Sequence, residues 1–355
     1  MTNIEDMDTH CMKKLNIVSS SMLFFCISAQ ATEINIYGQG HLSADNLDDS
    51  LYVTSSSSRL GFNGSYVIDT DLKVIFQYES GVDLTGQGGN DGNGGAESSG
   101  QIFTKGRPSF IGLEGKYGKA LIGHMPFLDQ WANDYNLFAD QVGDLGNLWE
   151  ASGVPGRSDN VMYYKTPRFS NIDIAVTYVP EEGKDNSDLL LFKANYNLKQ
   201  LKVGVAYTSV GQGINADNDH TAAAVTVGYT HGRYTIGGGF QLENDIAGLT
   251  DNDRETFNVG ASLKVGKNGK IKAQFASSTS DQSESDASQF AVGYDYNLAK
   301  NTVIYVAYAL MDNEDNVRFS VNGKGHGDKV VPAYGVDPSV FSIGIVYQFN
   351  HGLLK

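Results

Sequence analysis

The sequence is poor in cysteine, in basic residues and in long apolar runs, and each shortage excludes a class of protein. Its two cysteines, Cys11 and Cys26, lie near the start of the chain, so no disulfide framework supports the rest. Lys and Arg number 26 against 41 Asp and Glu, a net charge of −15. This excludes a nucleic-acid partner, because phosphate binding needs a basic face. After residue 31, no apolar run approaches the roughly 18 residues of a membrane-spanning helix.

Glycine and aromatic residues are abundant instead. The 355 residues include 41 Gly, 19 Tyr and 17 Phe beside only 7 Pro and 2 Trp. This composition favours β structure over helix, because aromatic side chains fit a pleated surface well. The length suits either two ordinary domains or one large β-barrel, so length alone does not decide.

Residues 1–31 have the features of an export signal. Lys13 and Lys14 form a charged region, residues 15–27 form an apolar or small-residue run, and Ala29-Gln30-Ala31 supplies a small-residue cleavage site. The apolar run is too short for a membrane anchor, which needs about 20 apolar residues. We therefore expect a signal peptide over 1–31, with translation starting at Met12 after an upstream extension, and a mature domain over 32–355.

Apolar and polar residues alternate along much of the mature sequence. Residues 72–79, for example, read Leu-Lys-Val-Ile-Phe-Gln-Tyr-Glu. A period of two predicts strands with one apolar and one polar face. For a single strand this pattern favours a soluble β-sandwich, because soluble β folds are commoner than membrane barrels.

The lengths of the connections favour a membrane barrel instead. Sixteen strands are expected, joined alternately by seven tight turns and eight longer connections. The tight turns are expected at 69–71, 114–119, 168–171, 197–200, 230–233, 266–270 and 297–301. The longer connections are expected at 45–51, 80–104, 125–158, 180–188, 209–220, 243–254, 279–285 and 311–338. An up-and-down barrel with short periplasmic turns and long outer loops has this asymmetry. It must close, because the bilayer core offers no water to unpaired backbone groups.

Three motifs carry a resemblance to a known family. They are Ser-Arg-Leu-Gly-Phe-Asn-Gly at 58–64, Arg-Pro-Ser-Phe-Ile-Gly-Leu at 107–113, and Gly156-Arg157 followed by Asn-Val-Met-Tyr-Tyr at 160–164 and Thr166-Pro167. With these motifs, the chain resembles the general-diffusion porins of Gram-negative bacteria over nearly all of residues 32–349. The resemblance implies an all-β, 16-stranded antiparallel transmembrane β-barrel with an inward-folded third loop. It also implies an outer-membrane channel for passive diffusion of small hydrophilic solutes and ions.

The resemblance also assigns residues to a pore constriction. Arg59, Arg107 and Arg157 match the arginines of the family's barrel wall. The segment 125–158 takes the place of the third loop, whose acidic residues face those arginines. Asp140 and Asp144 stand four residues apart and shortly before a glycine, which favours them as the facing acids, although further acids lie on the same loop: Asp129, Asp134 and Glu150.

Three positions depart from the family pattern. His124 stands where an arginine is common, and Lys165 stands where a carboxylate is common. Family members usually end in a terminal Phe that the barrel-assembly machinery reads, whereas here six residues follow Phe349. The last departure bears on the efficiency of assembly rather than on the fold.

The partners expected from the resemblance are two further copies of the chain, outer-membrane lipid and lipopolysaccharide, the barrel-assembly machinery, and the diffusing solutes and ions. The Gly-rich run 86–100 would reach over the neighbouring barrel of such a homotrimer. No cofactor or metal is expected. An enzyme is disfavoured, because neither a Gly-x-Ser-x-Gly elbow nor a His-Glu-x-x-His pair occurs and the histidines lack metal-ligand spacing.

Two functional questions remain open from the sequence. The first is whether the barrel is a channel at all, because an adhesin or other surface-binding barrel would also suit the acidic loops. The second question is ion preference. Removing residues 1–31 leaves 24 basic and 38 acidic residues. Acids on the loops would attract cations, and the constriction arginines would oppose them, so we expect mild cation selectivity that fades as salt rises.

Overall fold

The computed structural model describes the mature chain with several gaps. The described residues are 33–47, 50–85, 106–127, 135–149, 156–323, 325–327 and 331–354. The expected signal peptide lies outside them and stays a prediction. Ala31–Lys355 forms a single compact unit.

Strands dominate the described residues, which hold seventeen strands and two short 3-10 helices. The strands are β1 (Glu33–Leu47), β2 (Ser50–Ser55), β3 (Arg59–Asp69), β4 (Leu72–Gly81), β5 (Ser109–Gly115), β6 (Gly118–Pro126), β7 (Arg157–Lys165), β8 (Ile172–Val179), β9 (Leu189–Leu198), β10 (Leu201–Val210), β11 (His220–His231), β12 (Tyr234–Asn244), β13 (Arg254–Val265), β14 (Gly269–Ser280), β15 (Ala287–Ala299), β16 (Thr302–Asn313) and β17 (Ser339–Leu354). The helices are η2 (Leu145–Asn147) and η3 (Ile246–Gly248). No helix within the described ranges is long and apolar enough to cross a membrane.

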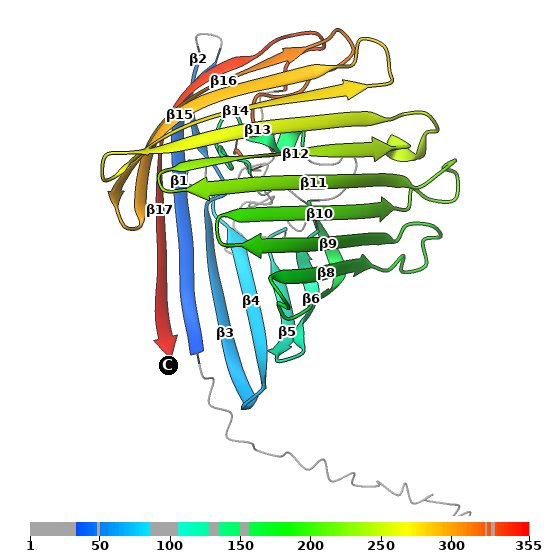
Figure 1. The fold of residues 1–355 in the computed structure, drawn as a ribbon, viewed down its shortest axis with the longest axis vertical. Helices are drawn as coiled ribbons and strands as arrows, with labels where there is room; N and C mark the ends of the chain where they lie inside the picture. Colours follow the sequence, from blue (N-terminus) through cyan, green and yellow to red (C-terminus); the bar gives the residue numbers. More distant parts are fainter. Residues whose placement is uncertain are drawn as a thin grey trace, which may run out of the picture. The chain divides into compact units, whose positions relative to one another are not determined.

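The strands form one closed antiparallel sheet. From β3 to β17 each strand pairs with the next one in sequence, and β1 pairs with both β17 and β3, so the pairing runs around a closed ring (Figure 1). β2 and β3 both pair with β1 and are consecutive halves of one barrel strand, interrupted at residues 56–58. The seventeen described strands therefore build a 16-stranded barrel, and the predicted all-β, 16-stranded antiparallel barrel is confirmed.

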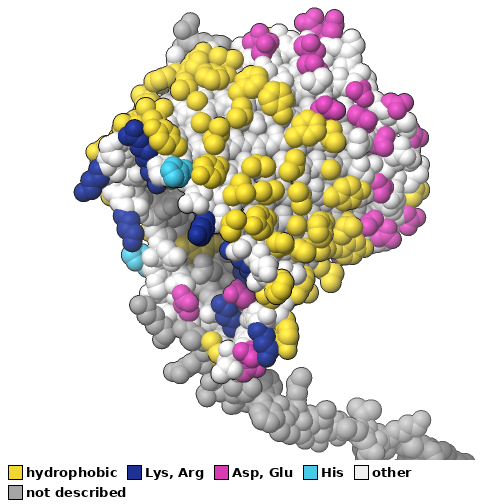
Figure 2. Space-filling model, viewed as in Figure 1, with side chains coloured by type: hydrophobic (Ala, Val, Ile, Leu, Met, Phe, Trp, Pro, Cys, Tyr) yellow, Lys and Arg dark blue, Asp and Glu magenta, His cyan; other side chains and the backbone are white. Residues whose placement is uncertain are grey.

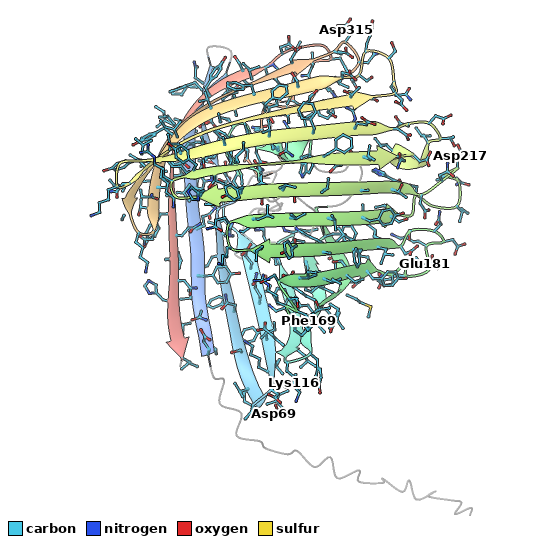
Figure 3. All side chains as sticks on the ribbon, viewed as in Figure 1. Asp69, Lys116, Phe169, Glu181, Asp217 and Asp315 are labelled. Atoms are coloured by element: carbon cyan, nitrogen blue, oxygen red, sulfur yellow. The ribbon has the colours of Figure 1, made fainter. Side chains whose placement is uncertain are left out.

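The connections differ in length at the two ends of the barrel. Short turns join β3 to β4, β5 to β6 and β7 to β8, among others, and the longer connections alternate with them. In Figure 3, Asp69, Lys116 and Phe169 mark short turns, whereas Glu181, Asp217 and Asp315 mark longer connections. One expectation is wrong: the connection expected at 45–51 reduces to residues 48–49, because β1 and β2 pair up to Leu47 and Ser50.

The two faces of the sheet differ in polarity. On β11, Val225, Val227 and Tyr229 point outward and are exposed, whereas Ala224 and Thr226 point inward and are buried. Outward-facing apolar side chains cover a broad area of the barrel, and acidic side chains gather at one edge of the view (Figure 2). An apolar exterior is compatible with lipid, because strand pairing around the closed sheet satisfies backbone groups that lipid could not.

The residues after Phe349 extend the seam that closes the barrel. β17 continues to Leu354, and Asn350, His351 and Gly352 pair with Tyr37, Ile36 and Asn35 of β1. The departure from the family's terminal Phe therefore lengthens the last strand without disturbing closure.

A charge placed on the outer face tests which surface meets lipid. Val259, in the middle of β13, and Val265, next to its turn, share the exposed outer face. We expect Val259→Arg to cost about 2–4 kcal/mol of stability and Val265→Arg only about 0–1 kcal/mol, because the penalty for a charge falls from the bilayer midplane to the interface. Reversible unfolding in lipid vesicles measures both, and equal costs would contradict a lipid-facing β13.

Candidate functional site

A break in the second barrel strand creates an unusual polar centre on the inner face. Ser57 lies between β2 and β3 with a φ of 50°, in the left-handed region that non-glycine residues seldom occupy. Its carbonyl oxygen accepts hydrogen bonds from Arg59 Nη1 at 3.1 Å and Arg107 Nη2 at 3.4 Å. Its hydroxyl donates to Asp140 Oδ1 at 2.8 Å. Ser57 therefore links two of the predicted arginines to one of the predicted acids.

Glu79 of β4 joins this centre as a counter-charge to the arginines. Its carboxylate lies 2.9 Å from Arg107 Nε and 3.7 Å from Arg59 Nε, and Tyr37 Oη donates to it at 2.9 Å. The side chains of Arg107 and Glu79 are only 4% and 8% exposed. A buried pair of this kind is costly to break, because the remaining charge loses its partner, typically at about 3–5 kcal/mol. Sequence reasoning placed Glu79 on the polar face and did not assign it to the site.

The third predicted arginine lies near the same centre. Arg157, at the start of β7, is half-buried. Arg107 interacts electrostatically with Glu79, Arg157, Arg59 and Asp140. The fold therefore gathers the three arginines, Asp140 and Glu79, which come from five separate stretches of sequence. Three positive and two negative groups leave this arginine cluster formally positive by one charge.

Asp144 is placed differently from the expectation of an acid facing the channel. It is buried, and its carboxylate accepts hydrogen bonds from the backbone N–H of Gly146 at 2.9 Å and of Asp140 at 2.8 Å. The Asn136 amide donates to the same carboxylate. Asp144 thereby caps η2 and holds the loop that carries Asp140. Burial, followed by repulsion from Asp140, raises the pKa of Asp144 to about 7.

Residues 135–149, the described stretch in the middle of the expected third loop, contact the inner face of the barrel on a second side as well. We call them the third-loop segment. The backbone N–H of Leu137 donates to Gln274 of β14 at 2.9 Å, and Lys272 of β14 donates to the Leu137 carbonyl at 3.0 Å. Phe138 and Trp149 of this segment are fully buried. The segment thus contacts the wall near Ser57 and the wall at β14.

The connection between β16 and β17 packs against the third-loop segment. Gly143 N donates to the carbonyl oxygen of Val321 at 2.8 Å, and Asn147 donates to that of Ser320. The same connection is attached to the wall, because Gly325 O lies 2.9 Å from Ser57 Oγ, sharing its proton with Asp140, and His326 Nε2 lies 3.1 Å from Asp45 Oδ2. Nothing in the sequence pattern pointed to these contacts.

The two other departures from the family pattern also form contacts. His124 Nδ1 lies 2.7 Å from Asp159 Oδ1. Lys165 lies 3.0 Å from Asp173, which Arg168 also contacts at 3.2 Å. Lys165 and Asp173 line a basic pocket on the inner wall of β7 to β10, together with Arg168, Lys193 and Lys202 among others. Among the described residues, no group of His, Cys, Asp and Glu side chains has the arrangement of a metal site.

Comparison with known proteins gives a consistent set of similarities. The sequence profile of the Gram-negative porin family matches residues 19–316. Outer membrane porin protein 32 of Delftia acidovorans is 28% identical, and the match covers 84% of this chain and 85% of that protein. Among solved structures, an anion-selective porin from Comamonas acidovorans is similar with a TM-score of 0.73 at 22% identity, covering 89% of this chain and 99% of the other. The trimer form of OmpT from Vibrio cholerae has a TM-score of 0.68 at 18% identity, covering 90% and 100%.

The raised pKa of Asp144 predicts a pH-dependent loop. Because the folded pKa lies near 7 and an exposed Asp titrates near 4, the stabilisation is fully present below about pH 4 and is lost as pH rises through about 7. We expect amide exchange at residues 140–146, corrected for its intrinsic rate, to speed up over this range.

Asp140→Asn should lower the midpoint of this transition, since repulsion by Asp140 contributes to the shift. Asp144→Asn should remove the transition. An unchanged exchange profile from pH 4 to 8 in the parent protein would contradict the assignment.

Proposed function

This chain belongs to the Gram-negative porin family, and on that premise we propose that its barrel encloses a water-filled path through which small hydrophilic solutes and ions diffuse passively. It is an outer-membrane porin, a channel protein rather than an enzyme. The single observation that best supports the proposed path is the arginine cluster on the inner face, with Asp140 reaching it from the third-loop segment.

The arrangement of charges supports a role in selecting solutes by size and charge. Arg59 and Arg107 belong to the barrel wall, whereas Asp140 belongs to a segment that crosses from that wall to β14. Opposite charges clustered beside a narrow aqueous passage create a strong local field, which orients polar solutes and disfavours apolar ones. We therefore infer that the arginine cluster and the third-loop segment together form the pore constriction.

We infer an ion preference that depends on salt. Many acidic residues lie on the longer connections, including Glu181, Asp217 and Asp315 (Figure 3), and they would enrich cations at the mouth. Exposed charges are screened over about 8 Å at physiological ionic strength, whereas half-buried charges are screened less. The expected mild cation selectivity should therefore hold at low salt and give way to the anion preference of the inner basic groups at high salt. One similar structure is that of an anion-selective porin, which supports that second tendency.

We also propose that the protein assembles as a homotrimer in the outer membrane. The similar OmpT structure is a trimer form, and the match covers 90% of this chain and all of the OmpT chain. Outer-membrane lipid would contact the exposed apolar face, and lipopolysaccharide and the barrel-assembly machinery are the further partners that family membership suggests.

Recordings from planar bilayers test the channel and its charges together. The purified protein should give stepwise openings. Arg157→Ser should shift the reversal potential toward cations and raise conductance, because it removes a fixed positive charge and a large side chain. Asp140→Asn should shift it toward anions.

The control for these variants is Asp217→Asn on a longer connection, which should act only at low salt. Closed, non-conducting barrels would instead favour a surface-binding barrel. A reversal potential unaffected by both inner variants would refute the assigned constriction.

The oligomeric state has a separate test. Unheated protein extracted under mild conditions should migrate on detergent gels as one oligomeric band that heat dissociates, and light scattering should give three times the monomer mass. A monomeric mass in the same extract would contradict a trimer.

A further inference from the structure

We propose that strand β14 positions the constriction, and that Lys272 is the principal positioning residue. The proposal rests on the proposed channel function, in which the third-loop segment carries Asp140. It concerns the part of the wall that the segment contacts, strand β14, which is well separated in sequence from the three arginines.

Lys272 of β14 contacts three residues of the third-loop segment. Its side chain is almost completely buried. Its ammonium group donates to Leu137 O at 3.0 Å and to Gln141 Oε1 at 2.7 Å, and lies 4.3 Å from the centre of the Phe138 ring. Asp295 of β15 balances its charge at 2.9 Å. A desolvated ammonium group with these partners has a fixed position, and it therefore fixes the position of the segment residues that it contacts.

Gln274, the next inward-facing residue of β14, completes the attachment. Its side-chain oxygen accepts from Leu137 N at 2.9 Å, and its amide donates to Gly143 O. The attached positions, 137, 141 and 143, lie on both sides of Asp140. The two side chains of β14 therefore fix the backbone that places Asp140 beside Ser57.

A row of glycines provides the surface on which the segment lies. Gly228 of β11, Gly237 of β12 and Gly260 of β13 are direct neighbours across the sheet, and Gly260 pairs with Gln274. A methyl group at Gly228 or Gly237 would collide with the Tyr135 ring, and one at Gly260 would lie 3.0 Å from Leu137. The absence of side chains in this row lets the segment approach the wall closely.

The position of Asp140 follows from this attachment. If β14 releases the segment, the contacts near Ser57, within the loop and with the β16–β17 connection remain, but the backbone on both sides of Asp140 loses its attachment to β14, so the distance of Asp140 to the arginines is less constrained. The channel should then become wider, noisier and less selective, while the barrel itself remains closed by its own strand pairing.

The variant Lys272→Met tests the proposal with a matched control. Lys270 lies on the same face of β14 and contacts Asp295 at 2.8 Å, so it still neutralises that carboxylate when Lys272 is replaced. Lys270→Met removes an equal charge, yet no described contact joins Lys270 to the segment. In planar bilayers we expect Lys272→Met to raise single-channel conductance about 1.5-fold or more, with added open-channel noise and weaker ion selectivity. Lys270→Met should keep the parental noise and conductance, and Lys272→Arg should restore them in part.

A second pair of variants avoids removing a buried charge. Gly237→Ala should displace the Tyr135 ring and give the same wider, noisier channel. In a Tyr135→Ala background the added methyl meets no ring, so Gly237→Ala should have little further effect. Such non-additivity identifies the contact itself as the cause.

The outcomes separate this proposal from the proposed function. A parent protein without conductance overturns the channel. A conducting parent whose Lys272→Met and Gly237→Ala variants match it in conductance, noise and selectivity overturns the positioning role of β14 alone. If Lys272→Met fails to fold, judged by heat-sensitive migration on gels, the Gly237 and Tyr135 variants decide.

Discussion

Backbone pairing in a medium without water is the constraint from which the rest of this structure follows. Each unpaired N–H or C=O in the bilayer core would cost several kcal/mol, so the sheet must close on itself. β1 and β17 close it over almost their full lengths, and the residues after Phe349 continue that seam. Closure gives every strand one face toward lipid and one face toward the interior. Polar side chains are unfavourable in contact with lipid, so they lie on the inner face.

That division explains why the fold could be predicted and the site only in part. Alternation and connection lengths are local properties, so sixteen strands could be located in the sequence, whereas the three arginines were located by the motifs that resemble the porin family. The role of Glu79 could not, because it depends on β4 lying beside the strand break at Ser57. The burial of Asp144 and the packing of residues 320–323 and 325–327 depend on contacts between distant loops. The row of Gly228, Gly237 and Gly260 becomes visible only when the register of three strands is known.

The arginine cluster illustrates how such a site is held together. Three guanidinium groups repel one another, and Glu79 and the Ser57 carbonyl offset part of that repulsion. The left-handed backbone at Ser57 is itself unfavourable, and it persists because the hydroxyl and carbonyl of that residue both have partners. Glu79 belongs to the wall with the arginines, whereas Asp140 is the acid that the described part of the third loop brings to them. Its position depends on how the loop is attached to the wall, at Ser57 and at β14.

The third-loop segment therefore joins two walls of different character. One wall carries charges and offers hydrogen bonds to Asp140, whereas the other offers glycines, Lys272 and Gln274 to the segment's backbone and rings. A segment fixed at one wall alone could swing, but attachment at both makes its position a property of the closed sheet, which is stiff because all its strands are paired. The requirement that closes the barrel against lipid thereby also limits how far Asp140 can move from the arginines. Within that limit, the side chains of β14 determine the position of the segment.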